Sequence, residues 1–228
     1  MSAILADLFD RNRAWAARNE AQRPGFFTRL LQQQSPQYLW IGCADSRVPA
    51  NEIVGLAPGE LFVHRNVANV VVHSDLNCLS VMEFAVDLLK VRHIIVVGHY
   101  GCSGVQAAML NTHVGIADNW LRHVQGVRNR HQVWLNSIDD GPLRLRALCE
   151  LNVLEQSRNV CETTVVQNAW NRDQEVVVHG WIYGLHNGLL QDIRMTVMHA
   201  DEVDAAYDLA LTELRRRYPS QGGATRPA

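Results

Sequence analysis

Short apolar runs alternate with amphipathic stretches along most of the chain. The runs at residues 38–41 and 61–63 predict two strands, and residues 94–97 are apolar on both faces, as in parallel strands covered by helices. Between the last two runs, residues 76–89 carry apolar side chains at helical spacing, with Ser74 as the expected N-cap. A strand, a helix and a strand in that order imply a right-handed crossover. The pattern predicts an α/β fold with a mostly parallel central sheet flanked by helices.

The first residues predict a helical arm. Residues 4–19 form an amphipathic pattern with a narrow apolar stripe, and a second short helix is expected over residues 26–33, after Pro24 and Gly25. Because the rest of the chain has enough apolar residues for a core of its own, this arm is suited to pack on a partner subunit.

The second half of the chain predicts mainly helices, followed by a hairpin. Helices are expected over residues 103–111, 120–135, 143–156, 163–171 and 202–217, with strands at 175–179 and 189–197. No internal repeat or linker is visible. We therefore expect one domain over residues 1–220 and a disordered tail over residues 221–228.

Two short motifs carry metal-ligand chemistry, and each directly follows a predicted strand. Cys43, Asp45 and Arg47 follow the first strand, and His99 and Cys102 follow the third. In open parallel sheets, ligands bind outside the carboxyl ends of the strands, so both motifs are expected at one edge. The two cysteines and the histidine supply three firm ligands for Zn²⁺, as in catalytic zinc sites. The carboxylate could take the fourth place, and the guanidinium could hold it off the metal.

A structural interpretation of the same residues is that Cys43 and Cys102 are buried small side chains and that His99 is a core histidine. It suits each residue taken alone, because free cysteine is among the most buried residue types. It does not explain why glycines, a carboxylate and a guanidinium accompany all three, so the metal site is favoured. The other cysteines, at 78, 149 and 161, lie in helical patterns and are expected to be structural.

Together, Cys43-Ala-Asp45-Ser-Arg47 and His99-Tyr-Gly-Cys102 resemble the zinc signature of the β-class carbonic anhydrases. The resemblance implies zinc-dependent, reversible hydration of carbon dioxide to bicarbonate and a proton. It implies that Cys43, His99 and Cys102 bind the metal. It also implies that Asp45 binds the metal in a closed state and pairs with Arg47 in the active state.

The resemblance extends to residues around a second site and to a subunit interface. Trp40, Arg65 and Tyr183 resemble the subgroup with a non-catalytic bicarbonate pocket, where bound bicarbonate would favour the closed, inhibited state. The resemblance further implies a homodimer or homotetramer. The expected substrate-cleft residues, of which the first three would come from a neighbouring subunit, are Gln34, Phe62, Phe84 and Gly104.

Composition narrows the class of partner. The chain has 228 residues and a net charge of -2, which gives no electrostatic reason to expect binding to nucleic acid or to an anionic membrane. Five cysteines are few for a chain of this length, and an odd number cannot all pair in disulfides. Both points argue against a disulfide framework and favour a reducing compartment. With no basic leader and no apolar run of membrane length, a cytoplasmic protein is expected.

Two other functions remain open on the residues alone. A hydrolase of carbon disulfide or carbonyl sulfide could use the same scaffold, because those substrates are also linear and apolar. A non-catalytic zinc or bicarbonate-sensing module is a second alternative. For the carbonic anhydrase interpretation, we expect activity to rise toward alkaline pH, since two thiolates donate more charge to zinc than imidazoles do.

Overall fold

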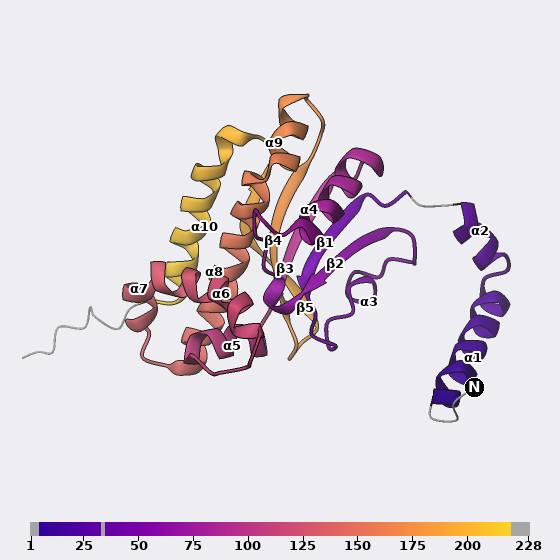
Figure 1. The fold of residues 1–228 in the computed structure, drawn as a ribbon, viewed down its shortest axis with the longest axis horizontal. Helices are drawn as coiled ribbons and strands as arrows, with labels where there is room; N and C mark the ends of the chain where they lie inside the picture. Colours follow the sequence, from indigo (N-terminus) through magenta and orange to yellow (C-terminus); the bar gives the residue numbers. More distant parts are fainter. Residues whose placement is uncertain (1–4, 33–34, 220–228) are drawn as a thin grey trace, which may run out of the picture. The chain divides into compact units, whose positions relative to one another are not determined.

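A computed structural model describes residues 5–32 and 35–219 of the chain (Figure 1). The chain divides into two compact units, residues 1–35 and residues 36–228. The expected single domain over residues 1–220 stays a prediction, and the expected tail at residues 221–228 lies outside the described residues.

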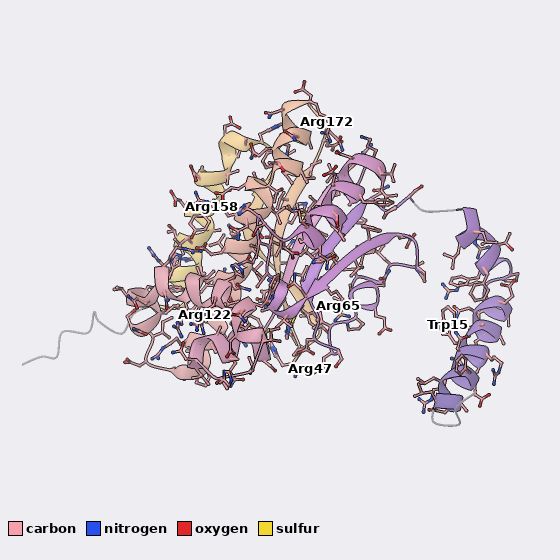
Figure 2. The ribbon with its side chains drawn as sticks, in the orientation of Figure 1. Trp15, Arg47, Arg65, Arg122, Arg158 and Arg172 are labelled. Carbon is pink, nitrogen blue, oxygen red and sulfur yellow. The ribbon has the colours of Figure 1, made fainter. Side chains whose placement is uncertain are left out.

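The first unit is the expected helical arm. It contains α1 (Ala6–Gln22) and α2 (Phe26–Gln32). The ring of Trp15, labelled in Figure 2, packs edge-on against that of Phe27, with centroids 5.8 Å apart. Phe9, on the apolar stripe of α1, is exposed. The helical arm is therefore confirmed, whereas its packing on a partner subunit stays a prediction.

The second unit is built on one sheet. Its five strands lie in the order β2-β1-β3-β4-β5, the first four parallel and the last antiparallel to its neighbour. Their bounds are β1 (Tyr38–Cys43), β2 (Leu61–Asn66), β3 (His93–His99), β4 (Val177–Gly184) and β5 (Leu189–Val197). The mostly parallel α/β architecture is confirmed.

Helices lie on both faces of this sheet, and most of them lie on one face. Their bounds are α3 (Ala50–Val54), η2 (Val67–Asn69), α4 (Leu76–Glu83), the π-helix η3 (Phe84–Leu88), α5 (Ser103–Leu110), α6 (Ala117–Arg130), α7 (Gln132–Asn136), α8 (Gly141–Glu162), α9 (Thr164–Asn171), η4 (Ala200–Glu202) and α10 (Val203–Arg217). The long helices α8 and α10 pack on each other and on the sheet (Figure 1). No helix in the described part of the chain is both long and apolar enough to cross a membrane.

Successive residues of β1 point into two separate cores, as the period of two in a strand requires. Leu39 and Ile41 belong to the larger core, which α4, α5, α6, α8, α9 and α10 share. Trp40 belongs to a smaller core on the opposite face, together with Ala50 of α3. Because β1 is buried on both faces, its carboxyl end is held firmly, and this end carries the first metal-ligand motif.

Helix bounds differ from the prediction in several places, and the segment expected as one helix over residues 120–135 forms two helices, α6 and α7. The N-cap of α4 is Asp75 rather than Ser74, because the Asp75 carboxylate accepts a hydrogen bond from the amide of Asn77 at 3.0 Å. The helix expected over residues 143–156 is also longer than predicted. It begins at Gly141, since Pro142 lies in the first turn, where its missing N–H has no helical partner in any case.

Candidate metal centre

The ends of β1 and β3 bring the two motifs together. Cys43 is the last residue of β1 and His99 the last residue of β3, and these strands are parallel neighbours. Cys102 is the N-cap of α5, three residues after His99. One ligand atom from each of the three lies within 4.8 Å of the others, and the two sulfurs are 3.8 Å apart. The structure therefore assembles the predicted trio, and all three residues are buried.

Two glycines shape the second motif. A Cβ on Gly98 would lie 2.4 Å from Cγ2 of Val153, so only glycine lets α8 approach the end of β3 this closely. Gly101 has a φ of +69°, a left-handed conformation that lets the chain turn back between His99 and Cys102.

The donor set of this cluster fits zinc. The Nδ1 of His99 lies 3.0 Å from the backbone oxygen of Tyr100, a contact that places the proton on Nδ1 and leaves the Nε2 lone pair free. Among the described residues, this buried Nε2 has no hydrogen-bond partner. Two sulfurs bound at about 2.3 Å in a tetrahedral arrangement lie roughly 3.8 Å apart, which is the spacing of the two sulfurs here.

The surroundings of the sulfurs favour negative charge on the pair. The hydrogen bond from Cys102 lowers the pKa of Cys43 against the opposing effect of burial, and the backbone amide of Ala68 lowers it further. The same contact with Cys43, together with burial, raises the pKa of Cys102, while the backbone amide of Val105 in α5 acts to lower it. One proton is thus shared between the sulfurs, and a divalent cation would replace it as the compensating charge.

Asp45 lies beside this cluster and is held by Arg47. One carboxylate oxygen of Asp45 accepts hydrogen bonds from the amide and Nε of Arg47, both at 2.9 Å, and the other accepts from Nη2 at 2.6 Å. These hydrogen bonds hold the pKa of Asp45 well below its usual range. The second oxygen is 3.7 Å from Nε2 of His99. The carboxylate is therefore ionised, paired with the guanidinium and next to the free lone pair.

A cavity of about 530 Å³ opens on the cluster. Its lining residues are Cys43, Ala44, Asp45, Ser46, Arg47, Val67, Cys102, Ser103 and Gly104. Of the expected cleft residues that the structure describes, only Gly104 lines this cavity. Phe62 and Phe84 stack on each other elsewhere, with ring centroids 5.9 Å apart, and Gln34 lies outside the described residues. The expectation that these three belong to a neighbour's cleft stays a prediction.

The residues of the expected second site share one face of the sheet. Gly42 is level with Arg65 in β2 and with Val97 in β3, and alternate residues of a strand share one face of the sheet. The side chains of Trp40, Arg65 and Tyr183 therefore all lie on the face that Gly42 and Val97 occupy. The guanidinium of Arg65 donates to the backbone oxygen of Cys43 at 2.9 Å and to that of Asp45. Figure 2 shows Arg47 and Arg65 at the same end of the sheet.

Sequence reasoning missed the turn η2, which borders the cavity through Val67. Ala68 in this turn is left-handed, with a φ of 66°. The residue that could have predicted this turn is Asn69, because asparagine adopts the left-handed conformation more readily than most residues. Alanine gives no such signal, because nothing in its side chain favours a left-handed backbone.

Two buried thiols and an imidazole at the carboxyl edge of a parallel sheet, beside a carboxylate that is held aside, form a group that could hold a metal ion in the manner of a catalytic site. Residues 38–190 match the family model described as carbonic anhydrase. The chain belongs to the β-carbonic anhydrase family.

Individual relatives agree with this assignment. A carbonic anhydrase from Emericella nidulans is 50% identical over 188 residues, which cover 82% of each chain. A β-carbonic anhydrase from Coccomyxa, solved with acetazolamide, superposes with a TM-score of 0.84 at 37% identity, covering 90% of this chain and 92% of that one. A tetrameric β-carbonic anhydrase from Sordaria macrospora gives a TM-score of 0.81 at 34% identity, covering 86% of this chain and all of that one.

Proposed function

We propose that this chain catalyses the reversible hydration of carbon dioxide to bicarbonate and a proton, with zinc held by Cys43, His99 and Cys102. The observation that carries the proposal is the free, buried Nε2 of His99 next to two sulfurs and 3.7 Å from a carboxylate that Arg47 keeps ionised. Zinc held there supplies a Lewis acid that lowers the pKa of water into the neutral range.

The role of Asp45 follows from its contacts. Its two oxygens are oriented by Arg47, so the carboxylate cannot rotate freely. An ionised carboxylate only accepts hydrogen bonds, and it therefore orients a water molecule with a hydrogen toward itself and a lone pair toward the cavity. Arg47 is anchored in turn by the backbone oxygen of Gly101, 3.3 Å from Nη2. The pair thus ties the two motifs together and fixes the direction of attack.

The cavity suits both substrate and product. Val67 and Gly104 offer apolar surface to carbon dioxide, which is linear and uncharged. Bicarbonate is an anion, and Ser103 at the start of α5 brings free backbone amides and the positive end of a helix dipole to the same cavity. The protein therefore stabilises the charge that develops as water adds to the carbon.

Rapid-mixing hydration assays across pH, together with the zinc content of the purified protein, test this function. We expect one zinc per chain and carbon dioxide hydration that rises toward alkaline pH. Carbon disulfide assayed in parallel should be a poor substrate. Stoichiometric metal without hydration at any pH would contradict the proposed activity, and protein free of metal would contradict the proposed site.

We further propose that Trp40, Arg65 and Tyr183 bind a second, inhibitory bicarbonate. Trp40 points its indole nitrogen over Gly42, because a Cβ on Gly42 would lie 2.2 Å from Nε1. This places an N–H donor on the face that also carries Arg65 and Tyr183. Arg65 already donates hydrogen bonds to the backbone oxygens of Cys43 and Asp45. An anion bound to the same guanidinium would compete for these donors, and it would therefore affect the segment that carries the active-site carboxylate.

Variants of Arg65 and Tyr183 test the inhibitory site. Tyr183→Phe removes only a hydroxyl, and we expect the bicarbonate concentration for half-inhibition to rise about fivefold, the equivalent of one hydrogen bond of about 1 kcal/mol. Arg65→Ala should abolish inhibition, since it removes the only positive charge of the predicted trio. Hydration rates measured against added bicarbonate give both values. Unchanged inhibition in the two variants would exclude the site.

We also propose a cytoplasmic homo-oligomer, either dimer or tetramer. The tetrameric relative from Sordaria macrospora supports assembly, and so does Phe84, a large apolar side chain that is 43% exposed. All five cysteines are free and buried, which supports a reducing compartment.

A further inference from the structure

A cluster of buried polar side chains next to the metal centre is built around Glu150 of α8, which is 2% exposed. Its Oε1 accepts hydrogen bonds from the hydroxyl of Tyr100 at 2.7 Å and from that of Tyr218 at 2.6 Å. Its Oε2 pairs with the guanidinium of Arg217. A buried carboxylate is costly unless it is paired and hydrogen-bonded, and these three donors satisfy it. The cluster thus ties the end of α10 to Tyr100, the residue that directly follows His99.

Tyr100 is held at three points. Its hydroxyl donates to Glu150, and its backbone N–H donates to the oxygen of Tyr183 in β4 at 3.0 Å. The guanidinium of Arg146, also in α8, lies over its ring, 3.8 Å from the centroid. The peptide after Tyr100 needs such support, because Gly101 permits many backbone conformations. The direction of the Tyr100 carbonyl group is therefore fixed by contacts of the side chain as well as of the backbone.

This carbonyl group orients the imidazole of His99. The Nδ1 of His99 lies 3.0 Å from the oxygen of Tyr100, and this contact determines both the direction of the ring and the nitrogen that carries the proton. The other nitrogen, Nε2, is the buried atom proposed to bind zinc. A chain of hydrogen bonds therefore runs from Glu150 through Tyr100 to the imidazole. A loosened Tyr100 would let the imidazole turn away from the two sulfurs.

We propose that Glu150 is a positioning residue for the metal centre: by holding the Tyr100 hydroxyl, it fixes the carbonyl group that orients His99. The inference deepens the proposed function, because it rests on His99 as a zinc ligand. Hydrogen bonds to a metal-bound histidine influence metal affinity about 10- to 100-fold. Tyr100 separates Glu150 from His99, so the effect of the carboxylate must pass through that residue.

Tyr100→Phe tests the proposal by removing one hydroxyl and keeping the ring. The carboxylate of Glu150 keeps its contacts with Tyr218 and Arg217, so we expect the variant to fold. The zinc dissociation constant, measured by competition with a chelator, should rise about tenfold. The Nδ1–H proton of His99, observed by NMR, should shift and exchange faster with water, because its acceptor is less constrained. A purely structural role of Glu150 would change neither quantity.

Glu150→Gln tests the carboxylate itself. The amide oxygen would turn toward the guanidinium of Arg217, so the Tyr100 hydroxyl loses its charged acceptor. We expect the zinc dissociation constant to rise about threefold to tenfold. Added to Tyr100→Phe, however, Glu150→Gln should not change zinc affinity further, because the contact through which it acts is already absent. Multiplicative losses in the double variant would mean that Glu150 acts by another route, and would overturn the proposal.

A second buried carboxylate of the same helix supplies the matched controls. Glu155 is 6% exposed, accepts a hydrogen bond from the hydroxyl of Tyr207 at 2.6 Å and pairs with His131 at 2.8 Å. The two clusters share no residue. Tyr207→Phe and Glu155→Gln therefore remove a hydroxyl and a charge of the same kind. We expect both controls to lower thermal stability without changing zinc affinity or the NMR signal of His99.

The comparison of the two tyrosines decides the proposal. If Tyr100→Phe binds zinc as tightly as Tyr207→Phe and leaves the His99 signal unchanged, Glu150 only supports the fold and the proposal is overturned. The same signal can be followed in the metal-free protein, so it still decides the proposal if the wild-type chain binds no zinc. Absence of zinc binding in the wild-type chain would instead contradict the proposed metal site, and the two hypotheses are therefore separated.

Discussion

Cys43→Ser is expected to abolish stoichiometric zinc binding and to lower carbon dioxide hydration by at least about 1000-fold. A tenfold change in rate corresponds to about 1.4 kcal/mol, and a Lewis acid contributes several kcal/mol to the barrier. Serine keeps the size of the side chain but has a hydroxyl that stays protonated at neutral pH, so the site loses one of its two anionic ligands. Zinc content by elemental analysis and rapid-mixing hydration rates give both quantities.

Cys161→Ala is the control for the loss of a buried sulfur. Cys161 is as buried as Cys43, lies in α8 and belongs to the larger core rather than to the metal cluster. We expect full zinc content and wild-type hydration, with a loss of stability of about 1 kcal/mol. If both variants retained zinc and activity, the assignment of Cys43 as a ligand would be wrong.

The metal cluster could be predicted because its position follows from strand geometry. Cys43 and His99 each end an apolar run, and the carboxyl ends of neighbouring parallel strands lie at one edge of a sheet. The ligand chemistry of cysteine, histidine and aspartate is carried by side chains, which the sequence states directly. The pairing of Asp45 with Arg47 could be predicted for the same reason, because the two residues are two positions apart in the chain and carry opposite charges.

Contacts made by the backbone could not be predicted in this way. Arg65 donates to the carbonyl oxygens of Cys43 and Asp45, and Asn152 donates to that of Ala68. Every residue has a carbonyl oxygen, so residue type says nothing about which one an arginine or asparagine will find. The conformation of the acceptor residue decides it, and that conformation results from packing between helices and turns far apart in the chain.

The predicted N-cap of α4 was wrong for a related reason. Ser74 and Asp75 are adjacent and are both good N-caps, so the sequence alone does not distinguish between them. The choice depends on the helical phase that buries Cys78 and Met82, which is determined by what α4 packs against. Residue identity therefore predicted that a helix begins here, whereas tertiary packing selected the first residue.

Asp45→Asn is expected to lower kcat/KM for carbon dioxide hydration about 100-fold while leaving zinc content unchanged. The amide has the size of the carboxylate, but it carries no charge and has one donor group in place of an acceptor. It can neither form a charge-assisted pair with Arg47 nor orient a water molecule through both oxygens. Losses of this kind, from one preorganised polar group, are typically 100- to 1000-fold.

Arg47→Gln tests whether the two residues act as one unit. If Arg47 works by holding Asp45, Arg47→Gln and Asp45→Asn lower kcat/KM by similar factors, and the double variant is no slower than Asp45→Asn alone, since residues that act as a unit are strongly non-additive. Arg47→Lys should recover little, because an ammonium group cannot reproduce the two parallel contacts of the guanidinium. Fully multiplicative losses in the double variant would instead mean that Arg47 acts on the substrate directly. That result would contradict the role given to the pair, because the hydrogen bonds to the carboxylate would then not be the reason that Arg47 matters.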